Sequence, residues 1–123
     1  MPTNGLILYL PLNGNANDST SYANNGINHG ATSVADRFGR PNKSFYFNGS
    51  SYINIPGSPL LNLARNKSLS SWIFLPSSEV QNRYPTVFHK DEPTMSSTYS
   101  ICLTDYYGYN SLSLQHKVNF YIC

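Results

Sequence analysis

The sequence predicts an all-β fold, an antiparallel two-sheet β-sandwich, on three observations. Charged residues make up 11% of the 123 residues and aromatic residues 14%, with ten tyrosines. Aromatic and β-branched side chains suit a pleated, half-buried surface, whereas the abundant Asn, Ser, Gly and Pro supply turns. Short apolar or alternating segments recur between these turns, and no segment has the pattern of an amphipathic helix. The length fits a single domain spanning residues 1–123.

The first half of the chain divides into a strand, a loop and a hairpin. Gly5 to Leu12 is an apolar run and is expected to be a core strand. Asn13 to Gly30 is expected to be a loop, because Gly, Asn, Asp or Ser occupies most of its positions. Two short strands, Lys43 to Phe47 and Ser51 to Ile55, are expected to form a hairpin about the turn Asn48-Gly49-Ser50.

The second half begins with a loop that carries one helical turn. In Pro56 to Ala64, Ser58 is a possible cap and Pro59 occupies the first helical position. Ser68 to Leu75 is expected to be a strand with Trp72 as a core anchor. Further short strands are expected at Thr86 to His89, Tyr99 to Leu103, Ser111 to Gln115 and Val118 to Ile122.

The last residues alternate apolar and polar side chains as a half-buried strand does, and the sequence stops there without a closing turn. An edge left in mid-sheet presents backbone groups that complete domains usually cover. We therefore expect the domain to be incomplete at its C-terminus. Cys102 and Cys123 lie in apolar, alternating segments, and the sequence leaves open whether they form a disulfide or stay buried thiols.

Taken in order, these segments resemble the concanavalin A-like, laminin G-like domains of bacterial surface and secreted proteins. The resemblance rests on residues 5–19, Asn24-Asn25-Gly26, Asp36-Arg37-Phe38-Gly39, residues 45–49, 52–56, 68–73, 87–91, 99–103 and 117–120. It implies a two-sheet jelly roll in which Trp72 is buried and further strands follow Cys123. It also implies an extracellular or cell-surface location, although the sequence shows no signal peptide.

Composition argues against several classes of partner and activity. The net charge of +2 comes from scattered Lys and Arg, so neither nucleic acid nor an anionic membrane is an expected partner. No apolar run approaches the roughly 18 residues of a membrane span. Asp91 and Glu92 are adjacent and precede Pro93, so they point apart on a turn rather than pairing across a cleft as glycoside hydrolysis requires. The chain is therefore not expected to be an enzyme.

The loop from Asn13 to Ser19 contains the residues that best fit a metal ion. Its carbonyl, amide and carboxylate oxygens are the hard ligands that Ca²⁺ prefers, and members of the resembled family often hold calcium near such loops. Asp18 and Asn17 are the expected metal ligands. The alternative is that both side chains only cap turns by bonding their own backbone, and with a single carboxylate this structural role is favoured at Asp18.

A tyrosine cluster between two expected strands is the candidate ligand site. Exposed tyrosines on a loop can stack on a sugar ring while neighbouring amide and carboxylate groups bond its hydroxyls. The alternative is a tyrosine-rich hairpin packed against its own sheet. The candidate residues are Tyr106, Tyr107, Tyr109, Asp105 and Asn110.

These observations predict a non-catalytic binding module that recognises carbohydrate or a protein and belongs to a larger extracellular protein with other domains. Two alternatives stay open: a structural spacer domain of an adhesin or phage-tail-like protein, and a fragment of a glycoside-active enzyme whose catalytic residues lie beyond Cys123.

Overall fold

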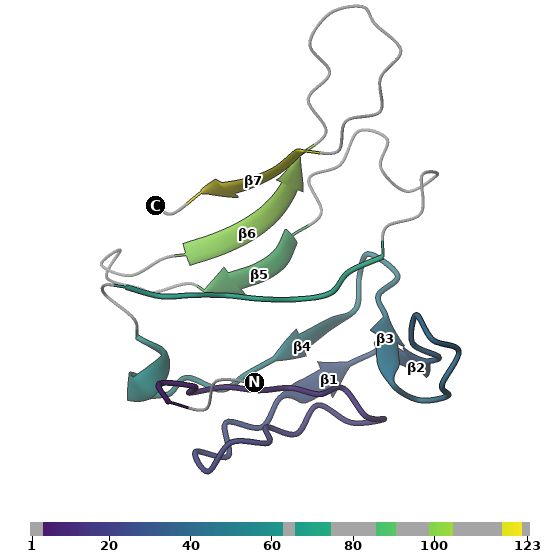
Figure 1. The fold of residues 1–123 in the computed structure, drawn as a ribbon, viewed down its shortest axis with the longest axis horizontal. Helices are drawn as coiled ribbons and strands as arrows, with labels where there is room; N and C mark the ends of the chain where they lie inside the picture. Colours follow the sequence, from purple (N-terminus) through teal and green to yellow (C-terminus); the bar gives the residue numbers. More distant parts are fainter. Residues whose placement is uncertain (1–3, 63–65, 75–85, 91–98, 105–116, 122–123) are drawn as a thin grey trace, which may run out of the picture. The chain divides into compact units, whose positions relative to one another are not determined.

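The computed structural model describes residues 4–62, 66–74, 86–90, 99–104 and 117–121, and in these residues the fold is β-rich, as expected. The strands form two 2-stranded sheets and one 3-stranded sheet, all antiparallel (Figure 1). The chain divides into two compact units, Met1–Asn62 and Leu63–Cys123. The expected single domain of residues 1–123 stays a prediction.

The strands of the first unit form an interrupted antiparallel ribbon. Strand β1 (Ile27–His29) pairs with β4 (Tyr52–Asn54), and β2 (Thr32–Val34) pairs with β3 (Ser44–Tyr46). Three steps along the chain lead from His29 to Thr32 on one arm, whereas six lead from Tyr46 to Tyr52 on the other. The second arm therefore carries three extra residues between its two paired stretches.

Those extra residues include the turn that the sequence assigned to a hairpin. The strands at β3 and β4 are confirmed, but the expected pairing between them is wrong, because each pairs with an earlier strand. The Oδ1 atom of Asn48 accepts hydrogen bonds from the N–H groups of Ser50 and Ser51, each at 3.0 Å. This local turn makes a bulge within one arm of the ribbon and does not reverse the chain.

The corner between β1 and β2 is held by one asparagine. Asn28 Nδ2 donates to the carbonyl oxygen of Ala31 at 2.8 Å, and Asn28 Oδ1 accepts from the Ala31 N–H at 2.9 Å. Gly30 supplies the left-handed backbone of the corner with φ of +80°. The prediction of a loop from Asn13 to Gly30 is thus wrong over β1. At the corner that follows, the Asn28 side-chain amide forms the hydrogen bonds to the Ala31 backbone.

The N-terminal segment differs from the expected core strand. Residues 6–12 are not assigned to a strand, and Leu12 has a φ of +56°. Instead, Tyr9 bonds to the loop that follows: its carbonyl oxygen accepts the Ser19 N–H at 2.8 Å, and its N–H donates to the Asp18 side chain at 3.0 Å. The Asp18 side chain therefore accepts the hydrogen bond from the Tyr9 N–H, which in a β-ladder would go to a neighbouring strand.

The expected helical turn is confirmed as the 3₁₀ helix η1 (Pro59–Leu61), which buries Leu61. Pro59 begins the helix with its preset φ. Ser58 stands at the N-cap with an extended backbone, as predicted, although its side chain makes no capping hydrogen bond. Its carbonyl oxygen accepts the Leu61 N–H at 2.9 Å. Within the described ranges no helix is long and apolar enough to cross a membrane.

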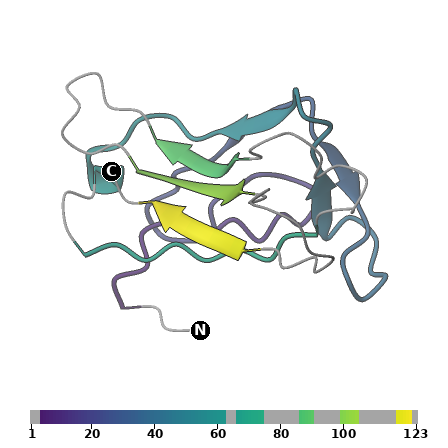
Figure 2. The same ribbon diagram turned by 90° about the horizontal axis from the view of Figure 1, so that it is seen from above.

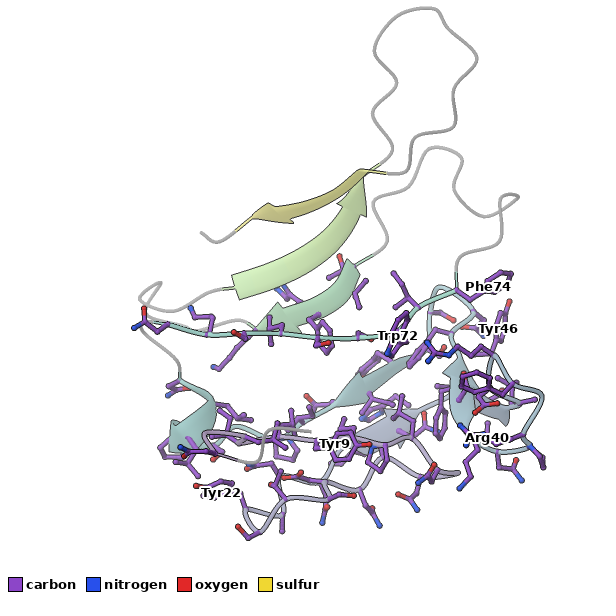
Figure 3. All side chains as sticks on the ribbon, viewed as in Figure 1. Tyr9, Tyr22, Arg40, Tyr46, Trp72 and Phe74 are labelled. Carbon is purple, nitrogen blue, oxygen red and sulfur yellow. The ribbon has the colours of Figure 1, made fainter. Side chains whose placement is uncertain are left out.

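The segment around the single tryptophan also departs from expectation. Residues 66–74 run without an assigned strand, so the strand expected from Ser68 is wrong over its described part. Trp72 is 85% exposed and Phe74 is 89% exposed, and both are labelled in Figure 3. Without a partner strand assigned, alternation alone does not bury either ring. The expectation that Trp72 is a core anchor is therefore contradicted.

The second unit contains the sheet β5 (Thr86–Lys90), β6 (Tyr99–Thr104) and β7 (Lys117–Tyr121), in that order (Figure 2). The register sets Phe88 opposite Ile101 and Ile101 opposite Phe120, so apolar positions align across all three strands. The register shifts between Thr86 and Phe88. Three expected strands are confirmed here, whereas Ser111 to Gln115 and Cys123 lie outside the described residues.

Candidate functional site

The Asp18 carboxylate is the centre of the hydrogen bonding in the Asn-rich loop. Its Oδ1 accepts from the N–H groups of Tyr9 at 3.0 Å and Thr20 at 2.9 Å. Its Oδ2 accepts from the Thr20 hydroxyl at 2.7 Å and from the Asn24 N–H at 2.9 Å. Four donors from three residues thus converge on one carboxylate and link the N-terminal segment to the middle of the loop.

Two asparagines complete this arrangement. Asn25 Oδ1 accepts the Asp18 N–H at 2.9 Å, and Asn24 Nδ2 donates to the Ile7 carbonyl oxygen at 3.2 Å. The Gly26 N–H then donates to the carbonyl oxygen of Ala16, which is buried, at 2.8 Å. The loop is therefore shaped by its own amide and carboxylate groups.

These bonds determine the protonation of Asp18. Partial burial alone would raise the pKa of its carboxyl, but the N–H groups of Tyr9, Thr20 and Asn24 and the Thr20 hydroxyl outweigh it and hold the pKa below its ordinary value. The carboxylate is therefore ionised near neutral pH and acts as a hydrogen-bond acceptor.

The same arrangement bears on the calcium expected at Asp18 and Asn17. An ionised carboxylate has about four lone-pair sites, and four donors of this chain occupy those of Asp18. Asn17 is exposed, and its N–H donates to Asn15 Oδ1 at 2.9 Å. Among the described residues no group of three or more His, Cys, Asp or Glu could hold a metal ion. The geometry favours the turn-capping role of Asp18 and does not fit a cation at its oxygens.

An aromatic pair lies on the β1–β4 ribbon. His29 and Tyr52 are opposite each other in the register, and their rings stack with centroids 4.5 Å apart and an interplanar angle of 15°. Tyr52 remains 54% exposed, and His29 is exposed. Cross-strand contact between flat rings limits the orientations that each can adopt.

Strand alternation places two further side chains beside this pair. Ile27 and Asn54 are opposite each other two residues along the ribbon, and both are exposed. Ile53, one residue out of phase, is half-buried and approaches Gly26 so closely that a Cβ there would lie 2.6 Å from its Cγ2 atom. Ile53 on one face of the ribbon thus approaches the loop at Gly26, and the opposite face presents two rings, an amide and an aliphatic side chain.

A second exposed feature is the turn after β2. The guanidinium carbon of Arg37 lies 4.7 Å from the centroid of the Phe38 ring, and that of Arg40 lies 5.2 Å from it. Phe38 is 65% exposed. Arg40 also donates from Nε to Asp36 Oδ2 at 2.7 Å, with Nη2 at 2.5 Å from the same oxygen. Two cations are therefore held against one exposed ring.

Asp36 organises this turn much as Asp18 organises its loop. Its Oδ1 accepts from the N–H groups of Phe38 at 2.9 Å and Arg40 at 3.0 Å. The hydrogen bond from the Arg40 side chain is the main reason that the pKa of the Asp36 carboxyl lies below its ordinary value, with the two N–H groups and the Arg40 charge adding to it against a small desolvation penalty.

The residues expected to bind a ligand, Tyr106, Tyr107, Tyr109, Asp105 and Asn110, lie outside the described residues. Neither the His29–Tyr52 pair nor the turn at Phe38 was predicted from the sequence as a binding site. The Arg-Phe-Gly-Arg spacing was a usable signal for the turn, because arginines three residues apart in a tight turn can both reach the ring between them. The pairing of β1 with β4, which brings His29 to Tyr52, had no comparable local signal.

Comparisons with protein-family models, with curated proteins and with solved structures found no match to this chain.

Proposed function

We propose that this chain is a non-catalytic module that binds carbohydrate. The observation that carries the proposal is the stacked His29–Tyr52 pair on the exposed face of the β1–β4 ribbon. The apolar C–H face of a sugar ring packs on an aromatic ring, and a nearby amide bonds its hydroxyls; Asn54 supplies that amide here.

Preorganisation of the two rings supports the proposal that the pair binds carbohydrate. Each ring limits the motion of the other, so the two side chains lose less conformational entropy when a ligand stacks on them than two separate rings would lose. The ribbon beneath is anchored by the close packing of Ile53 on Gly26 and by the Asn28 bonds to Ala31. A rigid strand pair presents the rings more reproducibly than a loop tip would.

We further propose the jelly-roll architecture of the concanavalin A-like, laminin G-like class, on the sequence resemblance and the antiparallel β-rich fold. The same resemblance supports an extracellular or surface location and further domains in the parent protein. Tyr106, Tyr107 and Tyr109, with Asp105 and Asn110, stay proposed as ligand-binding residues on the sequence alone, separately from the ring pair. A protein ligand is the alternative partner for the module.

A structural spacer is a second candidate, and one observation favours it. Several polar side chains of the first unit form their hydrogen bonds within the chain itself. Asp18, Asp36 and Asn48 each accept two or more hydrogen bonds from backbone groups. Asn28 bridges a turn by donating one hydrogen bond to Ala31 and accepting another from it. Loops whose polar groups are bonded internally hold their conformation without a ligand, as a spacer domain requires. The two candidates differ in whether the exposed rings bind anything.

A glycan array probed with the whole chain tests the proposal, once with calcium chloride and once with EDTA. The informative variant is Tyr52→Ala, which removes one ring of the pair. Tyr46→Ala is a matched control because Tyr46 is also a strand tyrosine and is 48% exposed.

We expect Tyr52→Ala to weaken glycan binding about tenfold and Tyr46→Ala to leave it unchanged. Binding that EDTA abolishes would assign the recognition to a calcium-dependent site and not to the ring pair. Absence of binding to any glycan under either condition would overturn the proposal and favour the spacer.

A further inference from the structure

We propose that the turn Asp36–Arg40 is a docking site for an acidic protein segment that carries an apolar side chain among its carboxylates. The turn is a different surface from the ring pair, and docking there does not depend on glycan binding. At this turn two arginines contact the exposed ring of Phe38.

The apolar part of the site is Phe38. A side chain that is 65% exposed on a turn leaves most of a large apolar surface in water, and covering it on binding is favourable. Aromatic residues and arginines are the types most enriched at the centres of protein interfaces. Phe38 with its two arginines has that composition in five consecutive residues.

Charge argues for an acidic partner. Residues 35–43 contain three cations, Arg37, Arg40 and Lys43, against the single carboxylate of Asp36. Arg40 is 64% exposed even though it is bound to Asp36, so its guanidinium still faces solvent. A planar guanidinium has five N–H donors and binds a carboxylate through two of them at once, which suits it to Asp and Glu side chains.

Preorganisation keeps the cost of docking low. The Asp36 N–H donates to the Arg40 carbonyl oxygen at 3.0 Å, and the Gly39 N–H donates to that of Asp36 at 2.9 Å. Gly39 takes the left-handed backbone, with φ of +77°, that closes the turn. The ring and both guanidinium groups are therefore already positioned before a partner arrives.

Two other occupants fit less well. A sugar would have to compete with the guanidinium groups that lie over the Phe38 ring, whereas carboxylates would add to them. A second copy of the chain carries the same net charge of +2, and its two carboxylates in the first unit are already bonded internally. An acidic segment of another protein supplies carboxylates for the guanidinium groups and carries a charge opposite to that of this turn.

The test measures binding of the whole chain to two short synthetic peptides, one rich in Glu with a single central Leu and one with Gln in place of each Glu. Dextran sulfate, a polyanion that is not a peptide, tests whether the turn binds any polyanion. Arg37→Ala keeps the Asp36–Arg40 pair, so the turn stays intact; Phe38→Ala removes the ring. Lys67→Ala removes one charge from the second unit and serves as the control. Amide NMR shifts locate the contact.

We expect the Glu peptide to bind more tightly than the Gln peptide, with shifts concentrated at residues 36–40. Arg37→Ala and Phe38→Ala should each weaken it about fivefold or more, and Lys67→Ala should not. Binding should also weaken as salt rises from about 0.01 M to about 0.1 M, where the screening length falls from about 30 Å to about 10 Å.

Equal binding of the Glu and Gln peptides, or equal loss in Lys67→Ala, would overturn the proposal. Binding of dextran sulfate as tight as that of the peptide, and indifferent to Phe38→Ala, would overturn it too, because it would show a general polyanion surface. None of these results affects the glycan proposal, which is tested at Tyr52.

Discussion

The backbone N–H of Tyr9 donates a 3.0 Å hydrogen bond to the side chain of Asp18, nine residues further along the chain. The Tyr9 carbonyl oxygen accepts the Ser19 N–H at 2.8 Å, so the loop satisfies both backbone groups of Tyr9. The bond therefore docks the N-terminal segment onto the Asn-rich loop where strand pairing was expected, and it makes Asp18 the most informative residue to change.

Replacing Asp18 with Asn should destabilise the chain by about 2 kcal/mol. Asn has the same shape but only one acceptor oxygen, and its amide N–H₂ would face N–H donors now bonded to Oδ1 or Oδ2. Urea unfolding measures the difference. Asn17→Ala, at an exposed neighbour, should change the free energy of unfolding by no more than about 0.5 kcal/mol. A cost that arises only in the presence of calcium would instead indicate a metal ligand.

Stability should fall in acid over a defined range. The pKa values of Asp18 and Asp36 in the folded chain lie below the ordinary 3.8, so their contribution is complete above that value and is lost as pH drops through the folded-state values. Urea unfolding at neutral pH and at several values below pH 3.8 should show this loss. Asp18→Asn should show a smaller loss, and parallel profiles for the two proteins would contradict the assignment.

Gly26→Ala should destabilise the chain by about 1 to 3 kcal/mol. An added Cβ would lie 2.6 Å from Ile53 Cγ2 and 3.1 Å from both the Cβ and the carbonyl oxygen of Ala16. Gly57→Ala is the matched control, because nothing lies within 4 Å of a Cβ at that position. Thermal or urea unfolding of the two variants compares them directly. A Gly26→Ala protein as stable as the Gly57→Ala protein would refute the close packing of β4 on the loop.

Trp72 should report its exposure through fluorescence, since it is the only tryptophan of the chain. With 85% of its surface exposed, its emission maximum and its quenching by acrylamide should be close to those of the chain unfolded in guanidinium chloride. A blue-shifted emission that acrylamide quenches poorly would instead show a buried ring, as the family resemblance implies.

Local signals in the sequence predicted the positions of the strands better than they predicted which strands pair. The strands at Ser44–Tyr46, Tyr52–Asn54 and Thr86–Lys90 were predicted because alternation and turn residues act within a few positions. The pairing of Tyr52–Asn54 with Ile27–His29 joins segments separated by more than twenty residues. It was missed because Asn-rich composition around β1 resembles a loop.

The candidate site shows the same division. The turn-capping role of Asp18 was predictable, since Asx side chains bond nearby backbone groups, and three of its four bonds involve residues within six positions. The fourth, from Tyr9, depends on how the N-terminal segment docks. The His29–Tyr52 stack depends on register between distant strands, which the composition of neither segment specifies.

The proposal that the exposed ring pair binds carbohydrate is tested most directly by NMR titration of the chain with an oligosaccharide selected on the array. The account predicts that the largest shifts occur at the ring protons of His29 and Tyr52 and at the side-chain amide of Asn54, and that Tyr52→Ala removes them. Shifts that leave these three residues unchanged while others move would contradict it.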